Sequence, residues 1–233
     1  MPNFHIQPVN WSIEGYFTAS SFVPANIQRD FQWTKHEIAQ LLDDLADFIA
    51  TDEPVYYLGP MVGTQSDQRK ISIYDGLQRT TTLTILIAAL RDRITDPVLK
   101  GRLNRCIKNE DDGSPRLTLS GNNNSLKTLV QDDDATIGLA TGGSQFGIHR
   151  TIRDNRNVIV RRLDRQSEDE LTILAKALLE KTEVIFVLTS SQSVAERIFD
   201  TTNRRGLSIE THDLIKSRLT CLLYTSPSPR DRG

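Results

Sequence analysis

The chain has 233 residues, with 28 basic and 30 acidic side chains and a formal net charge of −2. This length suffices for one large domain or two small ones, and the balanced charge means that any surface for a polyanion must be local. No segment reaches the ~18 apolar residues of a membrane span, and the first residues lack the basic start and apolar run of a leader peptide, so we expect a cytoplasmic protein without a membrane partner. Cys106 and Cys221 stand far apart and in no chelating spacing, which predicts free thiols, no disulfide and no metal centre.

The first half of the sequence predicts an amphipathic helix, a pair of strands and a second helix. The chain is extended around Pro24 and turns helical after Trp33, where Thr34 and Glu37 have the spacing of a capping box. Next, PVYYLGPMVGTQS and RKISIY predict two strands joined by an exposed turn, and an apolar helix begins near Thr80. The first helix should lie on a core, because its apolar residues recur at helical spacing: Ile38, Leu41, Leu42, Leu45, Phe48 and Ile49.

The second half predicts a helical excursion that returns to the sheet. Residues 96–145 contain runs rich in Gly, Asn, Asp and Ser, which favour loops around short elements. Helical periodicity returns from Ile148 to Lys181 and predicts two helices. The following TEVIFVLTS is typical of a buried central strand, which we expect to rejoin the first sheet. Residues 96–180 would then be an excursion from one α/β body, after which the chain resumes as helix, glycine stop and helix.

The last residues, TCLLYTSPSPRDRG, interrupt a helix whose pattern is incomplete. Their letters resemble a translated sequencing adapter, so we expect a truncated chain in which Leu219 or Thr220 is the last native residue. This gives one domain over residues 1–219 and a non-native tail over residues 220–233.

The stretch YDGLQRTTTLTIL passes from strand to helix at Gly76, and such a junction can cradle phosphate. The first N–H groups of a helix have no intrahelical partner, and the helix dipole adds partial positive charge there. Gly76 permits a tight turn, Arg79 offers a planar fork to phosphate oxygens, Gln78 supplies a neutral donor and acceptor, and Thr80–Thr82 offer hydroxyls. Asp75 could orient Arg79 or hold Mg²⁺ through water. In the alternative, Asp75 and Gly76 form a plain turn, Arg79 is solvated and the threonines cap the helix.

Four ordered motifs resemble one known family. VPANIQRDFQW, YYLGPMV, YDGLQRTTTLTIL and RIFDTTNRRGLSIETHDLIKSRL, spread over residues 22–219, resemble the N-terminal domain of GmrSD-type DNA restriction endonucleases. That pattern has a Q-R-x-[FY]-x-W start, an L-G strand, a D-G-Q-Q-R turn and a late F-x-x-x-N-x-R-G-x-x-[LI] segment ending D-L-I-K. The resemblance implies a ParB/sulfiredoxin-like α/β (α+β) fold, with a mixed sheet, flanking helices and a helical insertion. It also implies that the domain binds, and often hydrolyses, a nucleoside triphosphate such as GTP, ATP or CTP with Mg²⁺.

The matching positions give the candidate site. The D-G-x-Q-R turn corresponds to Asp75, Gly76, Gln78 and Arg79, of which the three polar residues are the candidate catalytic groups. Nucleotide binding is expected of Gly76 and of the Thr80 and Thr81 hydroxyls beside it. It is also expected of the other positions that match the family: Gln28, Arg29, Asn203 and Arg205. Leu77 stands where the family has Gln, so a side-chain donor is lost and hydrolysis follows less directly than binding. The late segment has a structural alternative, because a glycine at 206 can end a helix and Ser208 or Thr211 can cap the next one.

Two functions follow from this pattern. The first is an NTP-binding and NTP-hydrolysing regulatory module of a bacterial anti-phage restriction system, which gates an HNH-type nuclease domain on the missing C-terminus or on a partner chain. The second is a non-enzymatic ParB-like module that senses a nucleotide or DNA, modified or not. Leu77 and the arginine run from Arg150 to Arg165 favour the second, although a solvated helix face also explains that run. No nuclease motif is visible, so this fragment is not expected to cut DNA.

Overall fold

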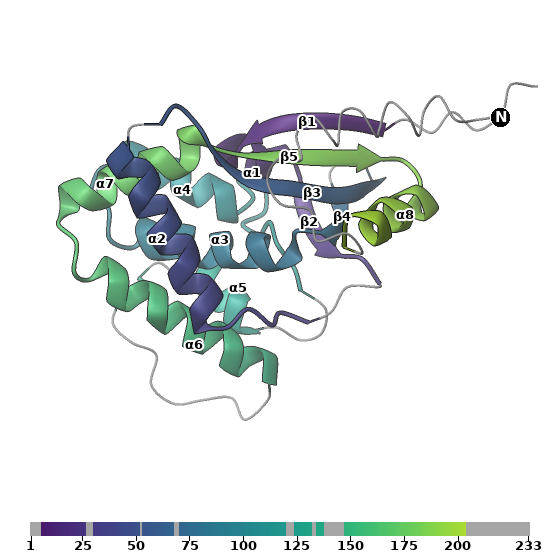
Figure 1. Ribbon diagram of the computed structural model, residues 1–233. Helices are drawn as coiled ribbons and strands as arrows, with labels where there is room; N and C mark the ends of the chain where they lie inside the picture. Colours follow the sequence, from purple (N-terminus) through teal and green to yellow (C-terminus); the bar gives the residue numbers. More distant parts are fainter. Residues whose placement is uncertain are drawn as a thin grey trace, which may run out of the picture.

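The computed structural model describes residues 6–26, 30–51, 53–67, 70–119, 124–131, 134–137 and 147–203. Its centre is a five-stranded mixed sheet in the order β1-β5-β3-β4-β2 (Figure 1). β1 pairs antiparallel with β5, β5 parallel with β3, β3 antiparallel with β4, and β4 parallel with β2. The strands are β1 (Ile6–Ser12), β2 (Ser21–Pro24), β3 (Tyr56–Asp67), β4 (Lys70–Asp75) and β5 (Thr182–Thr189). This confirms the expected mixed α/β class, whereas the likeness to ParB and sulfiredoxin folds stays a prediction.

Helices fill the connections between these strands. They are α1 (Ile13–Ala19), α2 (Lys35–Thr51), α3 (Leu77–Arg91), α4 (Pro97–Ile107), α5 (Asn124–Gln131), α6 (Gly147–Leu163), α7 (Glu168–Lys176) and α8 (Gln192–Asn203). A π-helical turn, Ala177–Lys181, joins α7 to β5. Within the described part of the chain, no helix combines the length and the apolarity that crossing a bilayer requires.

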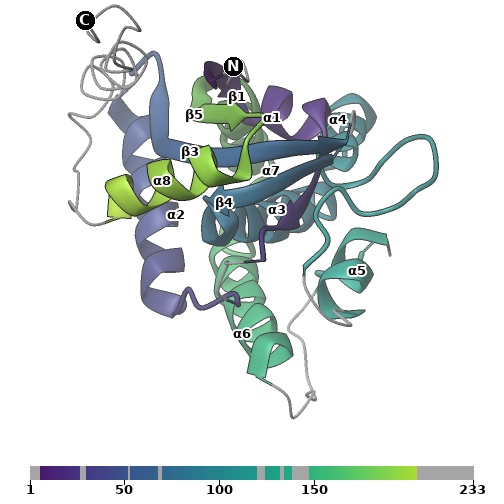
Figure 2. The same cartoon turned by 90° about the vertical axis from the view of Figure 1, so that its right-hand side faces the viewer.

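Helix α3 is the centre of the main core. It contacts α4, α5, α6 and α7, and nearly all of its residues are buried (Figure 1). Successive residues of a strand point to opposite faces, so Met61 packs in the core with α3 while Val62 packs in a smaller cluster with Ala195 of α8. Helix α8 therefore covers the face of the sheet opposite α3 (Figure 2).

Several predicted elements are confirmed. Helix α2 begins after Thr34, whose backbone N–H and hydroxyl both donate to the Glu37 carboxylate at 2.6 Å, and the predicted apolar stripe of α2 lies on the core. β3 and β4 form the predicted pair of strands and run antiparallel, and β5 is a buried interior strand of the same sheet, as expected. The chain thus returns to its first sheet after the helices α4–α7.

Two helix boundaries differ from the outline of the sequence. Helix α3 begins at Leu77, three residues before Thr80, because Gly76 adopts a left-handed conformation and starts the helix directly after the strand, at the predicted junction. From the sequence, no helix was specified within residues 97–107, which form the regular helix α4. Its signals were present: Asp96 caps the helix by accepting from the Val98 N–H, and Pro97 occupies the first turn.

Buried polar groups fix the helical excursion to the end of α3. Arg91 is fully buried and bonds Asp92, and it also donates to the carbonyls of Leu129 and Val130 at the end of α5. The Asp92 carboxylate in turn accepts from the N–H and the hydroxyl of Thr136. These bonds satisfy charges that would be costly to bury alone, and they tie α5 and the segment near Thr136 to α3.

Candidate functional site

Four segments of the chain meet at the corner around Gly76, where β4 ends and α3 begins. β2 and β4 are parallel, so their carboxyl ends lie at the same edge of the sheet, and β3, antiparallel to β4, begins there. The chain after β2 stays close to this edge, since the Ala25 N–H donates to the Ile73 carbonyl at 2.9 Å. The D-G-x-Q-R turn and residues 30–33, which Gln78 contacts, therefore lie at one corner of the fold.

Gly76 has the conformation that the turn requires. Its φ of 101° is left-handed, and it occupies the N-cap of α3 without a side-chain cap. A Cβ added there would lie 2.7 Å from Cγ of Met61, a buried core residue. The glycine is thus required both by the backbone conformation and by close packing on β3.

Arg79 fastens the beginning of β3. Its Nη1 donates to the Leu58 carbonyl at 2.8 Å and its Nη2 donates to the Pro60 carbonyl at 2.7 Å. These carbonyls flank Gly59, which has a φ of 90°, at a register shift between β3 and β5. The guanidinium also lies 3.5 Å from the Asp75 carboxylate, and its side chain is 19% exposed. Within the described part of the chain, carbonyls take two of the five N–H donors of this guanidinium, which leaves donors for Asp75 and for an anion.

Gln78 holds the segment that leads into α2. Its Oε1 accepts from the backbone N–H groups of Gln32 at 2.7 Å and Trp33 at 3.1 Å. Its Nε2 donates to the carbonyl of Asp30 at 3.1 Å. The side-chain amide is therefore engaged with the backbone of residues 30–33.

The three threonines after Arg79 face the interior. The Thr80 hydroxyl bonds the Gly76 carbonyl at 3.0 Å and the Tyr16 hydroxyl at 2.9 Å, and the Thr81 hydroxyl donates to the Leu77 carbonyl at 2.8 Å. Both threonines are fully buried, as is the hydroxyl of Thr82, which has no partner among the described residues. Burial raises the pKa of Tyr16, which keeps its hydroxyl neutral. In this conformation the threonines support the helix from inside and present no hydroxyl at the surface.

The partly exposed groups at the corner are the Asp75 carboxylate and the side chains of Gln78 and Arg79 in the first turn of α3. The Asp75 side chain is 21% exposed, and its ion pair is the one with Arg79. The N–H groups of Leu77, Gln78 and Arg79 lie in the first turn of α3, ahead of the first helical bond, which runs from the Thr80 N–H to the Gly76 carbonyl. Partial positive charge, a guanidinium and a carboxylate thus share one partly exposed corner.

The remaining candidates lie at or beyond the limits of the described chain. Gln28, Arg29 and Arg205 lie outside the described residues, as do Cys221 and the expected tail. Asn203 is the last residue of α8, and its side chain is not described. Helix α8 itself packs beside the corner, since Ala195 shares a cluster with Ala25 and with Tyr74, the residue before Asp75.

Sequence reasoning missed the groups that hold the corner together. Tyr16 lies outside the family motifs. Met61 and the carbonyls of Leu58 and Pro60 lie within YYLGPMV, but that motif gave no sign of their contacts with Gly76 and Arg79. Asn155 was missed as well: it is buried, and its Nδ2 donates to the Trp33 carbonyl at 2.5 Å. The tight L-G-P sequence of residues 58–60 was the one available signal, because glycine followed by proline marks an irregular strand.

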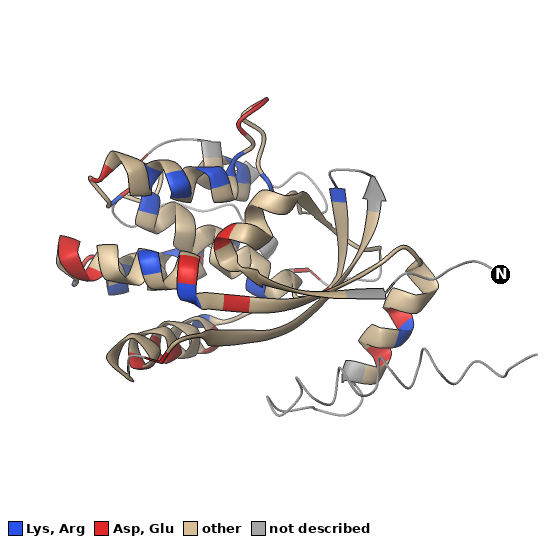
Figure 3. Ribbon diagram, turned by 90° about the horizontal axis from the view of Figure 1, so that it is seen from above, with Lys and Arg blue, Asp and Glu red and all other residues tan. Residues whose placement is uncertain are grey.

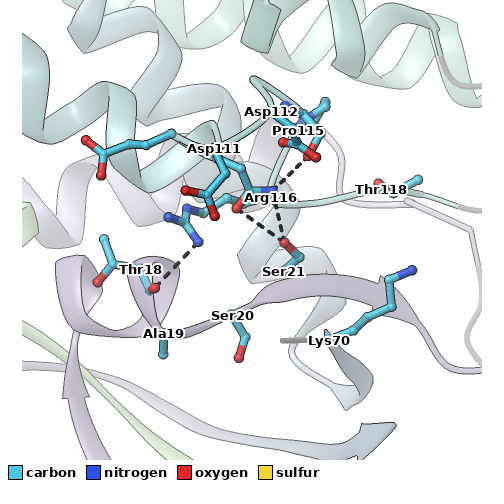
Figure 4. Close-up of a pocket in the computed structure, with 13 residues that line it drawn as sticks. Thr18, Ala19, Ser20, Ser21, Lys70, Asp111, Asp112, Pro115, Arg116 and Thr118 are labelled. Carbon is cyan, nitrogen blue, oxygen red and sulfur yellow. Dashed lines mark hydrogen bonds between the residues drawn. The ribbon is translucent and has the colours of Figure 1, made fainter. Parts of the chain in front are cut away.

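A separate polar cavity lies at the other end of β4. It has a volume of about 560 Å³ and is lined by residues of four regions, among them Thr18, Ser21, Lys70 and Arg116 (Figure 4). The Arg116 side chain spans its wall, donating to the Arg105 carbonyl at 2.7 Å and weakly to the Thr18 carbonyl at 3.5 Å. Because Lys70 begins β4 and Asp75 ends it, this cavity is distinct from the Gly76 corner.

The arginines of α6 are largely engaged within the protein. Arg162 pairs with Asp43, Arg153 pairs with Asp154, and Arg156 is buried with its Nη2 on the Ala135 carbonyl. Basic and acidic residues both occur along the ribbon (Figure 3), and α6 carries Asp154 among its arginines. The described part of α6 therefore offers no uniform basic face for DNA.

These observations define a class of protein: a mixed α/β domain that has buried helices on one face of its sheet and a strand–glycine–helix corner. The sequence model of the GmrSD restriction endonuclease N-terminal domain matches residues 13–220, and the chain belongs to this family. It is therefore a module of a DNA restriction system. Among curated proteins, no sequence matches the chain.

Proposed function

We propose that the chain is the nucleotide-binding and NTP-hydrolysing regulatory module of a bacterial anti-phage restriction system. In this proposal the nucleotide state of the Gly76 corner gates an HNH-type nuclease domain, supplied by the same polypeptide or by a partner chain, that acts on DNA. The observation that carries the proposal is the corner itself: the first turn of α3 beside the partly exposed Arg79 guanidinium and Asp75 carboxylate.

The proposed chemistry is phosphoanhydride hydrolysis. The N–H groups of residues 77–79 and the remaining donors of Arg79 would stabilise charge on the phosphate oxygens, which is the main task of such a site. Asp75 would hold Mg²⁺ through water, its carboxylate oxygens accepting hydrogen bonds from waters that this ion retains. Gln28, Arg29, Asn203 and Arg205 are the proposed further contacts. Thr80 and Thr81 would contribute through the helix that they stabilise rather than through their hydroxyls.

The test uses Asp75→Asn, which keeps the size of the side chain. Thermal-shift titrations with GTP, ATP and CTP, and release of inorganic phosphate with Mg²⁺, are measured for the wild type, for Asp75→Asn and for Asp47→Asn. Asp47 is an exposed carboxylate on α2 and serves as the matched control. We expect Asp75→Asn to lose phosphate release while Asp47→Asn keeps it. A wild type that responds to none of the three nucleotides would refute the proposal.

One observation favours a second function, a nucleotide- or DNA-sensing module without hydrolysis. Leu77, which replaces the family's Gln, is buried in the main core, so this position presents no polar side chain to a ligand. Nucleotide binding without phosphate release, both with Mg²⁺ alone and with Mg²⁺ and DNA present, would select this second function.

A further inference from the structure

Residues 30–33 are clamped between two helices by side-chain amides. Gln78 of α3 holds the carbonyl of Asp30 and the N–H groups of Gln32 and Trp33. Asn155 of α6 donates to the Trp33 carbonyl from the other side, and it is only 1% exposed. Both backbone groups of Trp33 are thus bound by side chains that are distant in the sequence.

The clamped segment is firmly attached at its carboxyl end as well. Phe31 is buried in the main core, and Trp33 packs against it. The Thr34–Glu37 capping interaction follows at once and starts α2. The segment therefore forms a fixed wall beside the first turn of α3, and its position is set by Gln78 and Asn155 together.

The bonding of Gln78 also limits what else its amide can do. A carbonyl oxygen has two lone pairs, and both are used by the N–H groups of Gln32 and Trp33. A phosphate or an attacking water would have to displace at least one of these bonds to reach Oε1. The amide is arranged to hold protein backbone rather than ligand.

Resting on the proposed nucleotide site, we propose that Gln78 and Asn155 are positioning residues of that site. They fix segment 30–33 against the Gly76 corner, and neither contacts the phosphates. Their effect on nucleotide binding follows from geometry, because residues 30–33 lie beside the first turn of α3 and their displacement would change the shape of the corner. Asn155 belongs to α6 and is connected to the corner through its bond to Trp33. A variant of Asn155 therefore tests the positioning role more directly than a variant of Gln78, which lies at the corner itself.

The experiment is a double-mutant cycle on the full chain. Nucleotide affinity is measured for the wild type, Gln78→Ala, Asn155→Ala and the double variant, with Gln40→Ala on the exposed face of α2 as the control. We expect each single variant to weaken binding by about tenfold and the double variant to be little worse than either, because both act through one segment. Gln40→Ala should bind as the wild type does. Gln78→Glu, which retains the acceptor oxygen but loses the donor to Asp30, is expected to be intermediate and covers the case in which Gln78→Ala does not fold.

Amide hydrogen exchange separates this inference from the proposed function. The N–H groups of Gln32 and Trp33 should be protected in the wild type and exposed in Gln78→Ala, with or without nucleotide. If the wild type binds nucleotide and Asn155→Ala binds it equally well, or if the two single effects simply add, the positioning role is overturned and the nucleotide site stands. If the wild type binds no nucleotide although Gln78 protects both amides, the proposed function fails, and the positioning role fails with it.

Discussion

Met61 packs against the open side of Gly76 so closely that a single added carbon would collide with it. A Cβ on Gly76 would lie 2.7 Å from Cγ and 2.9 Å from Sδ of Met61, and Met61 is fully buried. The corner is therefore built by a contact between β3 and the N-cap of α3, and this contact has a direct consequence for stability.

Gly76→Ala should destabilise the protein by on the order of 2 kcal/mol or more, since it adds both left-handed backbone strain and overpacking. Gly101→Ala is the matched control, because Gly101 lies within α4 and a Cβ there would meet nothing within 4 Å. The control should be neutral or stabilising by up to about 1 kcal/mol. Urea unfolding of both variants checks the prediction, and equal stabilities would show that the corner tolerates a side chain.

Arg79→Ala should destabilise the fold as well as weaken the binding of a nucleotide. It removes the donors to the Leu58 and Pro60 carbonyls, and hydrogen bonds from charged groups contribute about 1.5–3 kcal/mol each. Arg150→Ala is the control, since the side chain of Arg150 is 73% exposed and its removal should cost about 0.5 kcal/mol or less. Thermal unfolding without nucleotide gives the comparison. Any loss of nucleotide binding in Arg79→Ala has to be compared with this loss of stability. An unchanged midpoint of thermal unfolding would contradict the role of Arg79 in holding the beginning of β3.

Arg91→Met should be among the most damaging single substitutions in the described chain. It leaves the buried Asp92 carboxylate without its ion-pair partner and frees the carbonyls at the end of α5, at a cost of about 3–5 kcal/mol. Arg165→Met, at an exposed position after α6, is the control. Denaturant unfolding measures both, and a loss below about 1 kcal/mol for Arg91→Met would mean that the network contributes little.

Acid sensitivity should depend partly on Glu14. The hydrogen bond from Arg102 holds the pKa of the Glu14 carboxyl below its ordinary value of 4.5. A carboxyl with a lowered pKa in the folded state stabilises the protein above its ordinary pKa, and this contribution is lost as the pH falls through the folded value. The free energy of unfolding of the wild type should therefore fall more steeply between about pH 5 and pH 3 than that of Glu14→Gln.

The control for the acid prediction is Glu53→Gln, because Glu53 is exposed and has no ion pair among the described residues. Its unfolding curve should follow that of the wild type across the same pH range. If the free energy of unfolding depends on pH in the same way for the wild type and Glu14→Gln, the ion pair between Arg102 and Glu14 does not contribute to stability.

Local patterns explain which elements could be predicted. The α2 stripe, the β3–β4 pair and the buried run of β5 each carry a periodicity that reports burial directly. β1 and α1 carry no such signal: Ile6–Ser12 contains a proline and polar residues, and it is a strand because β5 offers it an edge with which to pair. Helix α4 was hidden by the loop-like composition around it, although its proline and aspartate marked its start.

The sequence by itself determined the family, the strand–glycine–helix junction at Gly76 and the residue types gathered there, because these depend on local conformation and on the order of motifs along the chain. Only the tertiary structure decided what those side chains do. Arg79 reaches the carbonyls of β3, Gln78 reaches residues 30–33, and the threonines bond inward to their own helix and to Tyr16. The physical reason is that a polar side chain bonds whatever backbone folding brings within reach, and partners far away in the sequence leave no mark in the local pattern.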